Sequence, residues 1–449
     1  MLDGRAVAVA EGMRSVVPVG LLVLLTSTNA LAQDERSLTL SEVVTTARAR
    51  SADVRAARAN AEGAEAAADA AYAGYLPSAS GQASALRSWS HSYQPDANGI
   101  MISTPQAAIG ANVAGTLKWT AWDFGRTSSA VAGAKAEARA AAANAEVAAN
   151  DAVRTAASLF LRAVFDEELV QVAQATVKLR EKHANMSRAM VMAGTRPPVE
   201  EARARVELSL ARLELTSAEQ RLAQDRVRLT TALMMDPNAK PKLIRPAVLP
   251  TVRMDGPSAA DRAVAHRPDV RAAEETVTAR EEGVDAAKAQ RYPTIGVSLE
   301  GLYRANRPDD DNRFFPNSSI TALATLTIPI FDWGLWGAIP VARGELASAE
   351  AKRDGTRLRV QGEAAEAVVA VSAAATLAEQ ARSARELSAA TLAVIEARYQ
   401  AGIAGPLELF DAGKNDADAR TAAIRAEQAL ATATVEALAA TGRLSELVR

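Results

Sequence analysis

The chain carries the same landmarks twice, in the same order. The pentapeptide Asp-Val-Arg-Ala-Ala occurs at 53–57 and again at 269–273, an offset of 216 residues. Three further landmarks recur at offsets of 216, 209 and 208 residues. They pair Tyr75-Leu76-Pro77 with Arg291-Tyr292-Pro293, Trp122-Asp123-Phe124-Gly125 with Phe331-Asp332-Trp333-Gly334, and residues 193–200 with 401–408. Four landmarks that drift by only a few residues indicate a tandem duplication, so we expect two equivalent structural halves.

The repeat divides the chain into parts. The first repeat covers residues 33–236 and the second covers 258–449, with a Pro-rich connection over 237–257. Residues 1–32 precede both, and they have the features of a secretory signal peptide. Met13-Arg14-Ser15 supplies a basic start, Val16–Leu25 is apolar but too short to span a bilayer, and Ala30 and Ala32 supply a cleavage site. We expect cleavage after Ala32, and both Met1 and Met13 remain candidate starts.

Each repeat contains one very long helix-forming stretch. These stretches, Thr127–Ala193 and Leu335–Ala401, have 67 residues each, enough for helices of about 100 Å. A shorter helical stretch precedes each long one and another returns after it. In order, these shorter stretches are Ser41–Gly74, Val199–Met235, Ser258–Arg291 and Pro406–Leu447. Because the two short stretches of a repeat together match its long one, we expect antiparallel hairpins in which two short helices stack end to end beside a long helix.

The returning stretch Val199–Met235 has two apolar series with a seven-residue period, which is typical of coiled coils. The first seam, as we call it, is Leu208, Leu215, Leu222 and Leu229. The second seam is Val199, Val206, Leu213, Val227 and Met234, with Gln220 as its polar break. The seams lie about 200° apart around a helix. This arrangement predicts a neighbour on each side and water on the other two faces, as in the wall of a tube. A loosely patterned, alanine-rich bundle is the alternative.

Period-two patterning is confined to the segments between these helices. The four segments are Ser78–Ser90, Ile109–Thr120, Thr294–Tyr303 and Ser318–Ile330. Alternation of apolar and polar residues over about ten positions is typical of outer-membrane strands, although a water-soluble hairpin is an alternative. We expect the polar tracts His91–Pro105 and Arg304–Asn317 to be exposed loops.

Tryptophan placement favours the membrane interpretation. All five tryptophans lie within or just beyond the strand segments, and aromatic residues gather where a barrel meets lipid headgroups. They are Trp89, Trp119, Trp122, Trp333 and Trp336. Beyond Ala32 no uncharged apolar stretch reaches spanning length, so any crossing by the mature chain must use strands. Hydrocarbon does not tolerate open sheet edges, and the smallest membrane barrels have about eight strands. The chain must therefore oligomerise to close its barrel.

Composition excludes several classes of function. The 51 Lys and Arg residues nearly balance 53 Asp and Glu residues, which gives no reason to expect a nucleic-acid partner. Cysteine is absent, so thiolate metal sites, disulfides and a lipidated N-terminal cysteine are excluded. The histidines His91, His183 and His266 are scattered, and no phosphate-binding glycine loop occurs. We predict no catalytic, cofactor or metal site and no enzymatic activity.

The signal peptide, the twofold repeat, the paired strands, the 67-residue helices and the two Gly/Pro tips together resemble the TolC family of outer-membrane efflux proteins. The resemblance covers essentially everything after Ala32. It implies a mainly α-helical trimer in which long antiparallel hairpins form an α-barrel. Four strands per protomer would contribute to a shared twelve-stranded β-barrel in the outer membrane, with a periplasmic helical extension and no lipid anchor. Pro241, Pro246, Pro250 and Pro257 would mark the equatorial connection.

The resemblance also implies partners and sites. The chain would be the exit duct of a tripartite efflux or type I secretion system, with a periplasmic adaptor and an inner-membrane pump or ABC exporter. The hairpin tips that would meet the adaptor contain Gly194, Pro198, Gly402 and Pro406. The periplasmic gate would be formed by Glu200, Tyr399, Glu408 and Asp411. By the same resemblance, Tyr399 would help to latch the closed mouth by bonding to the carboxylate of Glu200. The family's partner arginine falls at Ala404, so this latch is incomplete unless Arg196 substitutes for it.

A structural or adhesin-like periplasmic coiled-coil protein is the alternative from another class. Such a protein would lack heat-modifiable migration and would not fractionate with the outer membrane. A passive conduit takes its specificity from the pump behind it, and the sequence does not name the exported substrate.

Overall fold

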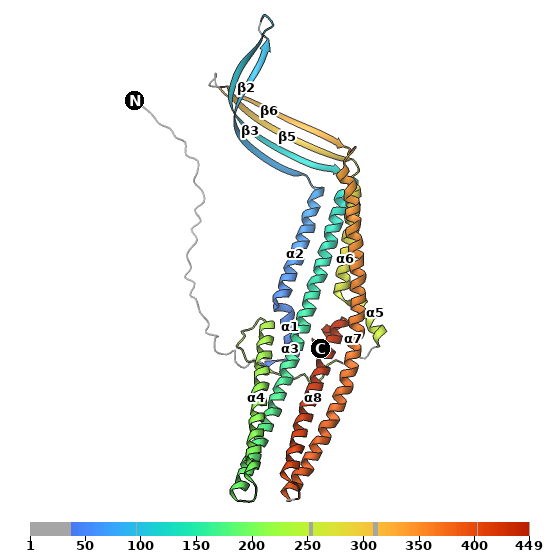
Figure 1. Ribbon diagram of the computed structural model, residues 1–449. Helices are drawn as coiled ribbons and strands as arrows, with labels where there is room; N and C mark the ends of the chain where they lie inside the picture. Colours follow the sequence, from blue (N-terminus) through green and yellow to red (C-terminus); the bar gives the residue numbers. More distant parts are fainter. Residues whose placement is uncertain (1–36, 96, 251–254, 309–312, 402, 449) are drawn as a thin grey trace, which may run out of the picture.

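The computed structural model describes residues 37–95, 97–250, 255–308, 313–401 and 403–448. The expected signal peptide, its cleavage site and Gly402 lie outside these residues. Figure 1 shows an elongated molecule with a four-stranded sheet at one end and the turns of two helical hairpins at the other. The second repeat repeats the element order of the first.

The two long helices are confirmed. They are α3 (Arg126–Met192), of 67 residues, and α7 (Trp333–Gln400), of 68 residues. The returning helices are α4 (Pro198–Ala232) and α8 (Pro406–Ala440), and a 3₁₀ turn over Leu444–Val448 follows α8. The expected helical stretch to Leu447 is therefore too long. It ends at Ala440 because Gly442 adopts a left-handed φ of 70° and the Arg443 amide donates to the Leu438 carbonyl, an arrangement that closes a helix C-terminus.

The opening helix of each repeat is broken, contrary to the expectation of one helix over 41–74 and one over 258–291. The structure has α1 (Leu40–Arg50) and α2 (Ala52–Tyr72), followed by a 3₁₀ turn at Ala73–Tyr75, and α5 (Gly256–His266) and α6 (Pro268–Ala289). The breaks lie at Ser51 and Arg267, which occupy equivalent positions in the repeat. Arg267 is extended at ψ 132° because the following Pro268 disfavours the helical conformation. Ser51 is likewise extended at ψ 137° without a proline, which the sequence pattern did not predict.

End-to-end stacking of short helices is confirmed. In Figure 1, α1, α2 and α4 run along α3, while α5, α6 and α8 run along α7. Near the middle of the molecule, α1, α3, α8 and the end of α4 meet in one apolar cluster. Its fully buried members include Val43, Phe160, Leu229, Val435 and Leu438. Here β1 (Ser37–Leu38) also pairs in parallel with β4 (Lys242–Leu243) of the Pro-rich connection, a contact that the sequence analysis missed.

The four expected strands form one antiparallel sheet in the order β2-β3-β5-β6. Their bounds are Ser78–Pro95, Met101–Trp122, Thr294–Pro308 and Phe315–Thr327. The strands run far into the tracts that we expected to be loops. Residues such as His91 and Pro105 are paired across β2 and β3, because ladder pairing continues up to the tight turn that contains Gly99, at φ 80°.

The register of the sheet separates its two faces. Val113 pairs with Tyr303 and Leu117 with Leu299, whereas Asn112 pairs with Arg304 on the opposite face. Since side chains alternate along a strand, the face that carries Val113 and Leu117 has an apolar band at this level, and the face that carries Asn112 is polar. Farther from the helices, Arg87 and Arg307 lie on the first face beside Ile109. In the described sheet, β2 and β6 are the edge strands. None of the helices in the described ranges combines the length and the apolarity needed to cross a membrane.

Candidate gate at the hairpin tips

Both hairpin turns lie where the sequence placed them, at the end of the molecule farthest from the sheet (Figure 1). In the first tip, Gly194 has a φ of 72°, which favours glycine, and the Thr195 amide donates to the Met190 carbonyl. Pro198 then occupies the first turn of α4, where a missing N–H has no cost. In the second tip, the amides of Ile403 and Ala404 both donate to the Arg398 carbonyl before α8 begins.

A cavity of about 310 Å³ lies between the two tips. It brings together Glu200 and Tyr399, two of the predicted gate residues, and Arg196. Arg196 Nη1 lies 3.5 Å from Glu200 Oε1, so the arginine pairs with Glu200 within its own hairpin. Within the described residues, no hydrogen bond joins the Tyr399 hydroxyl to Glu200. The remaining wall is largely apolar and includes Met186, Met190, Leu407, Leu409 and Phe410.

The other two predicted gate residues do not line this cavity. Glu408 and Asp411 are both exposed on the first turns of α8. Burial chiefly raises the pKa of Glu207, on α4, and the negative charge of Asp411 raises it further against the opposing effect of Arg180 and Arg203. Asp411 therefore lies close to the first hairpin, whereas Glu200 and Tyr399 lie between the hairpins.

A buried arginine that the sequence patterns did not predict lies above this cavity. Arg180, on α3, is only 6 % exposed. Its guanidinium carbon lies 4.1 Å from the centre of the Phe410 ring, and its Nη1 lies 3.9 Å from Glu207 Oε2. Nothing in the local sequence signals this burial, because charged residues are common along both helices.

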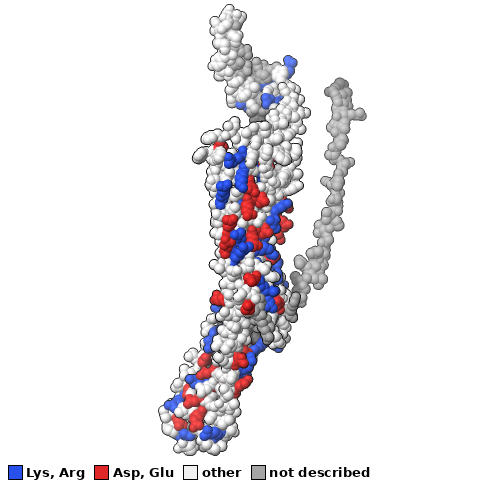
Figure 2. Space-filling view, turned by 90° about the vertical axis from the view of Figure 1, so that its right-hand side faces the viewer, with Lys and Arg blue, Asp and Glu red and all other residues white. Residues whose placement is uncertain are grey.

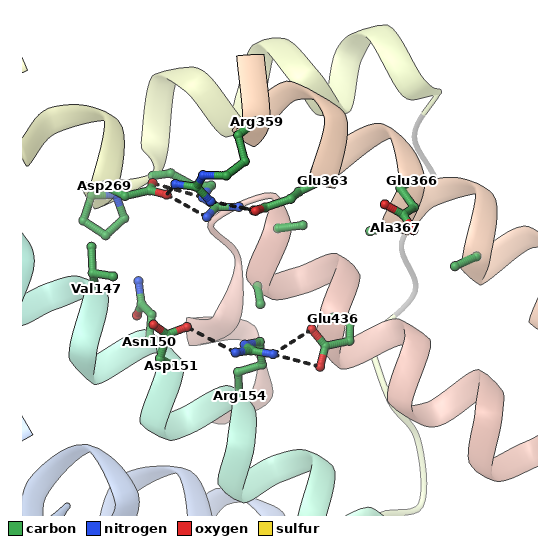
Figure 3. Close-up of a pocket in the computed structure, with 15 residues that line it drawn as sticks. Val147, Asn150, Asp151, Arg154, Asp269, Arg359, Glu363, Glu366, Ala367 and Glu436 are labelled. Carbon is green, nitrogen blue, oxygen red and sulfur yellow. Dashed lines mark hydrogen bonds and ion pairs between the residues drawn. The ribbon is translucent and has the colours of Figure 1, made fainter. Parts of the chain in front are cut away.

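A second charged cluster lies at the helix break of the second repeat (Figure 3), around a cavity of about 640 Å³. Arg267 donates to Asp269 and Glu363 at 2.7 and 2.5 Å, and Arg359 donates to the same carboxylates at 3.0 and 2.6 Å. Burial opposes ionisation of Asp269, but the two arginines outweigh it and lower the pKa of this carboxyl. Since each of these charges has a partner, the cluster braces α6 against α7.

The first hairpin also holds two buried carboxyls side by side. Asp166, on α3, and Asp225, on α4, are 8 % and 5 % exposed. Burial, followed by the charge of Asp225 and a hydrogen bond with it, raises the pKa of Asp166 to about 6, against the effects of Arg221 and Arg162. Asp225 is tied to Arg228 at 2.9 Å. The two carboxyls therefore share one buried position between α3 and α4.

The tryptophans are exposed, and most lie where the sheet meets the helices. Trp119 and Trp122 end β3, and Trp333 and Trp336 begin α7; Trp89 lies farther along β2. Their exposed fractions range from 43 % for Trp119 to 78 % for Trp333. Figure 2 shows charges of both signs along the helical part and few at the sheet end. No group of three His, Cys, Asp or Glu side chains suited to a metal ion occurs in the described ranges.

Comparisons with known proteins agree with this architecture. A sequence model of the family "Outer membrane efflux protein" matches residues 43–233 and 259–443, which are the two repeats. Protein CyaE of Bordetella pertussis is 28 % identical over 334 residues, covering 73 % of this chain and 70 % of that protein. Outer membrane protein OprJ of Pseudomonas aeruginosa is 28 % identical over 225 residues, covering 48 % of this chain and 44 % of OprJ.

Solved structures share the fold. A membrane protein from Pseudomonas aeruginosa superposes with a TM-score of 0.76 at 22 % identity, covering 91 % of both chains. The CmeC outer membrane channel of Campylobacter jejuni gives a TM-score of 0.76 at 19 % identity, covering 90 % of this chain and 85 % of CmeC. The fold, the twofold repeat and the family match agree: the chain belongs to the outer membrane efflux protein family.

Proposed function

We propose that this chain is one protomer of a trimeric outer-membrane exit duct through which substrates leave the periplasm passively. The second seam of α4 carries the proposal. Its members Val199, Val206 and Leu213 are 66 %, 59 % and 67 % exposed in the single chain, although they repeat every seven residues. A coiled-coil seam of this kind requires a facing helix. The exposed valines and leucines of α7, among them Leu387 and Val394, offer a surface of the same chemistry at the opposite edge of the protomer.

The sheet supports the same assembly. Its edge strands β2 and β6 would meet those of neighbouring protomers, and its apolar band would face lipid. Three copies of four strands would make a twelve-stranded barrel, above the minimum of about eight strands for a membrane barrel. The exposed tryptophans at the junction with the helices would lie at the periplasmic headgroup level.

The test of this function is assembly and conductance of the full chain. We expect the protein in the outer-membrane fraction, heat-modifiable migration on a gel, a mass of three protomers by light scattering in detergent, and ion channels in a planar bilayer. A water-soluble, heat-insensitive protein that forms no channels would support the coiled-coil alternative and contradict the duct.

The tips supply the proposed gate and the proposed contact with an adaptor and its inner-membrane pump. Three copies of Glu200, Glu408 and Asp411 around one mouth would concentrate negative potential and attract cations. We expect a cation-preferring channel that multivalent cations block from the periplasmic side. A trimer with Glu408→Ala and Asp411→Ala tests this: block and ion preference should weaken, and their survival would remove these carboxylates from the gate.

A further inference from the structure

Along α3 and α8, the contacts that join the two hairpins of one chain differ in kind between the middle of the molecule and the tips. Near the middle of the molecule, Arg154 Nη1 lies 3.3 Å from Glu436. Arg245, from the connection between the repeats, donates to Glu168 of α3 at 2.5 Å and to Glu427 of α8 at 2.7 Å. The two Arg245 contacts are short, charge-assisted hydrogen bonds. Together with the apolar cluster of α1, α3, α4 and α8, they hold α8 against α3 at this level.

Nearer the tips, the same two helices are joined through Arg180. The Phe410 ring of α8 covers its guanidinium at 4.1 Å, and Glu207 of α4 is its nearest carboxylate at 3.9 Å, beyond hydrogen-bond distance. Its Nη1 is buried and makes no hydrogen bond within the described residues. We name Arg180, Glu207 and Phe410 the clasp. A guanidinium has five donors, and a buried donor without an acceptor is costly.

The pKa shifts of the groups around the clasp also reflect the cost of burying charge. Burial is the largest influence on all three titratable groups of this region. It lowers the pKa of Arg180 and of His183, and it raises the pKa of Glu207. The charges of Glu207 and of Asp418, on α8, partly offset the burial of Arg180. The guanidinium therefore lies between a carboxylate of each hairpin without a full hydrogen bond to either.

A glycine one turn beyond Phe410 lies at the contact between α8 and α3. A Cβ atom at Gly413 would lie 3.3 Å from Leu179 Cδ2, tighter than ordinary van der Waals contact, so a larger residue would require the Leu179 side chain to shift. The small residue fits the close packing of α8 on α3 beside the Phe410 ring.

We propose that the clasp sets how readily the tip of the second hairpin separates from the first, with the mid-molecule ion pairs as the fixed end. When α8 moves away from α3, Phe410 uncovers Arg180, which regains water and can complete its ion pair with Glu207. The hydration gained on separation exceeds the lost ring contact, so the buried cation weakens the closed arrangement, which the packing of α8 against α3 keeps only slightly favoured. Arg180 acts here as a positioning residue, and the clasp rests on the proposed channel function.

The experiment separates the ring's interaction with the cation from simple packing. Phe410→Leu keeps most of the bulk but removes the aromatic face, whereas Phe410→Tyr keeps the face. In planar bilayers containing purified trimers, we expect Phe410→Leu to raise the open probability about fivefold to tenfold, as loss of one cation–π contact implies. Phe410→Tyr should stay within about twofold of the unsubstituted channel. Asn415→Ala, at an exposed position on the same helix that lines none of the cavities described, is the control.

A second variant tests the cost of burying the charge, with the opposite sign. Arg180→Met combined with Glu207→Gln replaces the ion pair by uncharged groups, so closing no longer desolvates a cation, and open probability should fall below that of the unsubstituted channel. Trimer content on unheated gels must be unchanged in every variant compared. Equal open probability of Phe410→Leu and Phe410→Tyr, or a rise in the open probability of the double variant, would overturn the clasp alone. Absence of channels from the unsubstituted protein would overturn the duct and the clasp together.

Discussion

The two returning helices have the same length but very different surroundings. Both α4 and α8 have 35 residues and begin with proline. α8 lies between α3 and α7, and it buries apolar side chains along much of its length, including Leu409, Ile424, Val435 and Leu438. α4 packs against α3 at the edge of the protomer, and its only buried apolar side chains are Ala218 and Leu229 within its described length.

This difference indicates which part of the wall is complete within one chain. α8 has a neighbour on each side, whereas α4 has its first seam packed and its second seam exposed. The sequence patterns do not reveal the difference, because α4 has the clearer coiled-coil period of the two. An apolar seam that is exposed in the single chain indicates a partner outside it.

The largest effect is expected from charging the second seam of α4. Leu213→Glu should abolish the trimer while leaving helix content unchanged, because Leu213 is 67 % exposed in one chain but would be buried in the assembly. Light scattering in detergent and circular dichroism measure the two properties. Thr216→Glu, on the same helix between the two seams, is the control and should still form trimers. A trimeric Leu213→Glu protein would show that α4 does not lie at a protomer interface.

The next largest effect is expected from truncating a buried side chain of α8, the helix that already has a neighbour on each side. Leu438→Ala, on α8, removes a fully buried side chain at 0 % exposure, and we expect the free energy of unfolding to fall by about 2–5 kcal/mol. Leu210→Ala, on α4, removes a side chain that is 59 % exposed and should change it by less than about 0.5 kcal/mol in the dissociated chain. Denaturant unfolding followed by circular dichroism compares them. Equal losses would show that α4 is as enclosed as α8.

A smaller effect concerns pH and the first hairpin. Asp166 has a folded pKa of about 6, above its ordinary 3.8, so the folded chain binds more protons between these values. Stability should therefore fall as pH rises from about 4 to 6, by about 1–2 kcal/mol from this group. Asp166→Asn should remove that slope and stabilise the chain at pH 7. The groups facing Asp166 include Asp225 and the cavity-lining arginines Arg162, Arg221, Arg228 and Arg425.

The control for this slope is Asp151→Asn on the same helix, whose side chain is 61 % exposed. It should leave the pH dependence of unfolding unchanged. The pH prediction would be wrong if Asp166→Asn kept the slope of the unsubstituted chain.

The smallest effect is expected at the first tip. Arg196 and Glu200 are 3.5 Å apart with side chains 39 % and 33 % exposed, and such surface pairs contribute at most about 1 kcal/mol. A double-mutant cycle with Arg196→Gln and Glu200→Gln should give a coupling energy of about 0.5 kcal/mol or less. A larger coupling energy would mean that this pair is buried in the assembly. The first tip would then differ from the second, whose turn at Ile403–Gly405 carries no charge.

Much of the fold could be predicted from local patterns. The internal repeat, the 67-residue helices, the four strands and both turns follow from periodicity and from glycine and proline positions, because these depend on short-range geometry. The break at Arg267 was also predictable in retrospect from Pro268. The break at Ser51 was not, because no residue there forbids a helix.

The candidate sites, like the fold, could be predicted only in part from the sequence. Tyr399 was expected to bond to Glu200; the two residues line one cavity, but no hydrogen bond joins them within the described residues. The Arg180 clasp, the raised pKa of Asp166 and the cluster around Arg267 depend on residues far apart in sequence that the packing of α3 against α4 and α8, and of α6 against α7, brings into contact.

The periods of the helices and strands, and with them the twofold architecture and the two seams of α4, follow from the residue pattern alone. Which seam is filled within the chain, which charges are buried and which helices meet follow from the packing of the folded chain. Periodicity specifies the face that a helix presents, but burial depends on what lies opposite that face, and desolvation, which sets the energy of Arg180 and Asp166, exists only once the neighbouring helices are in place.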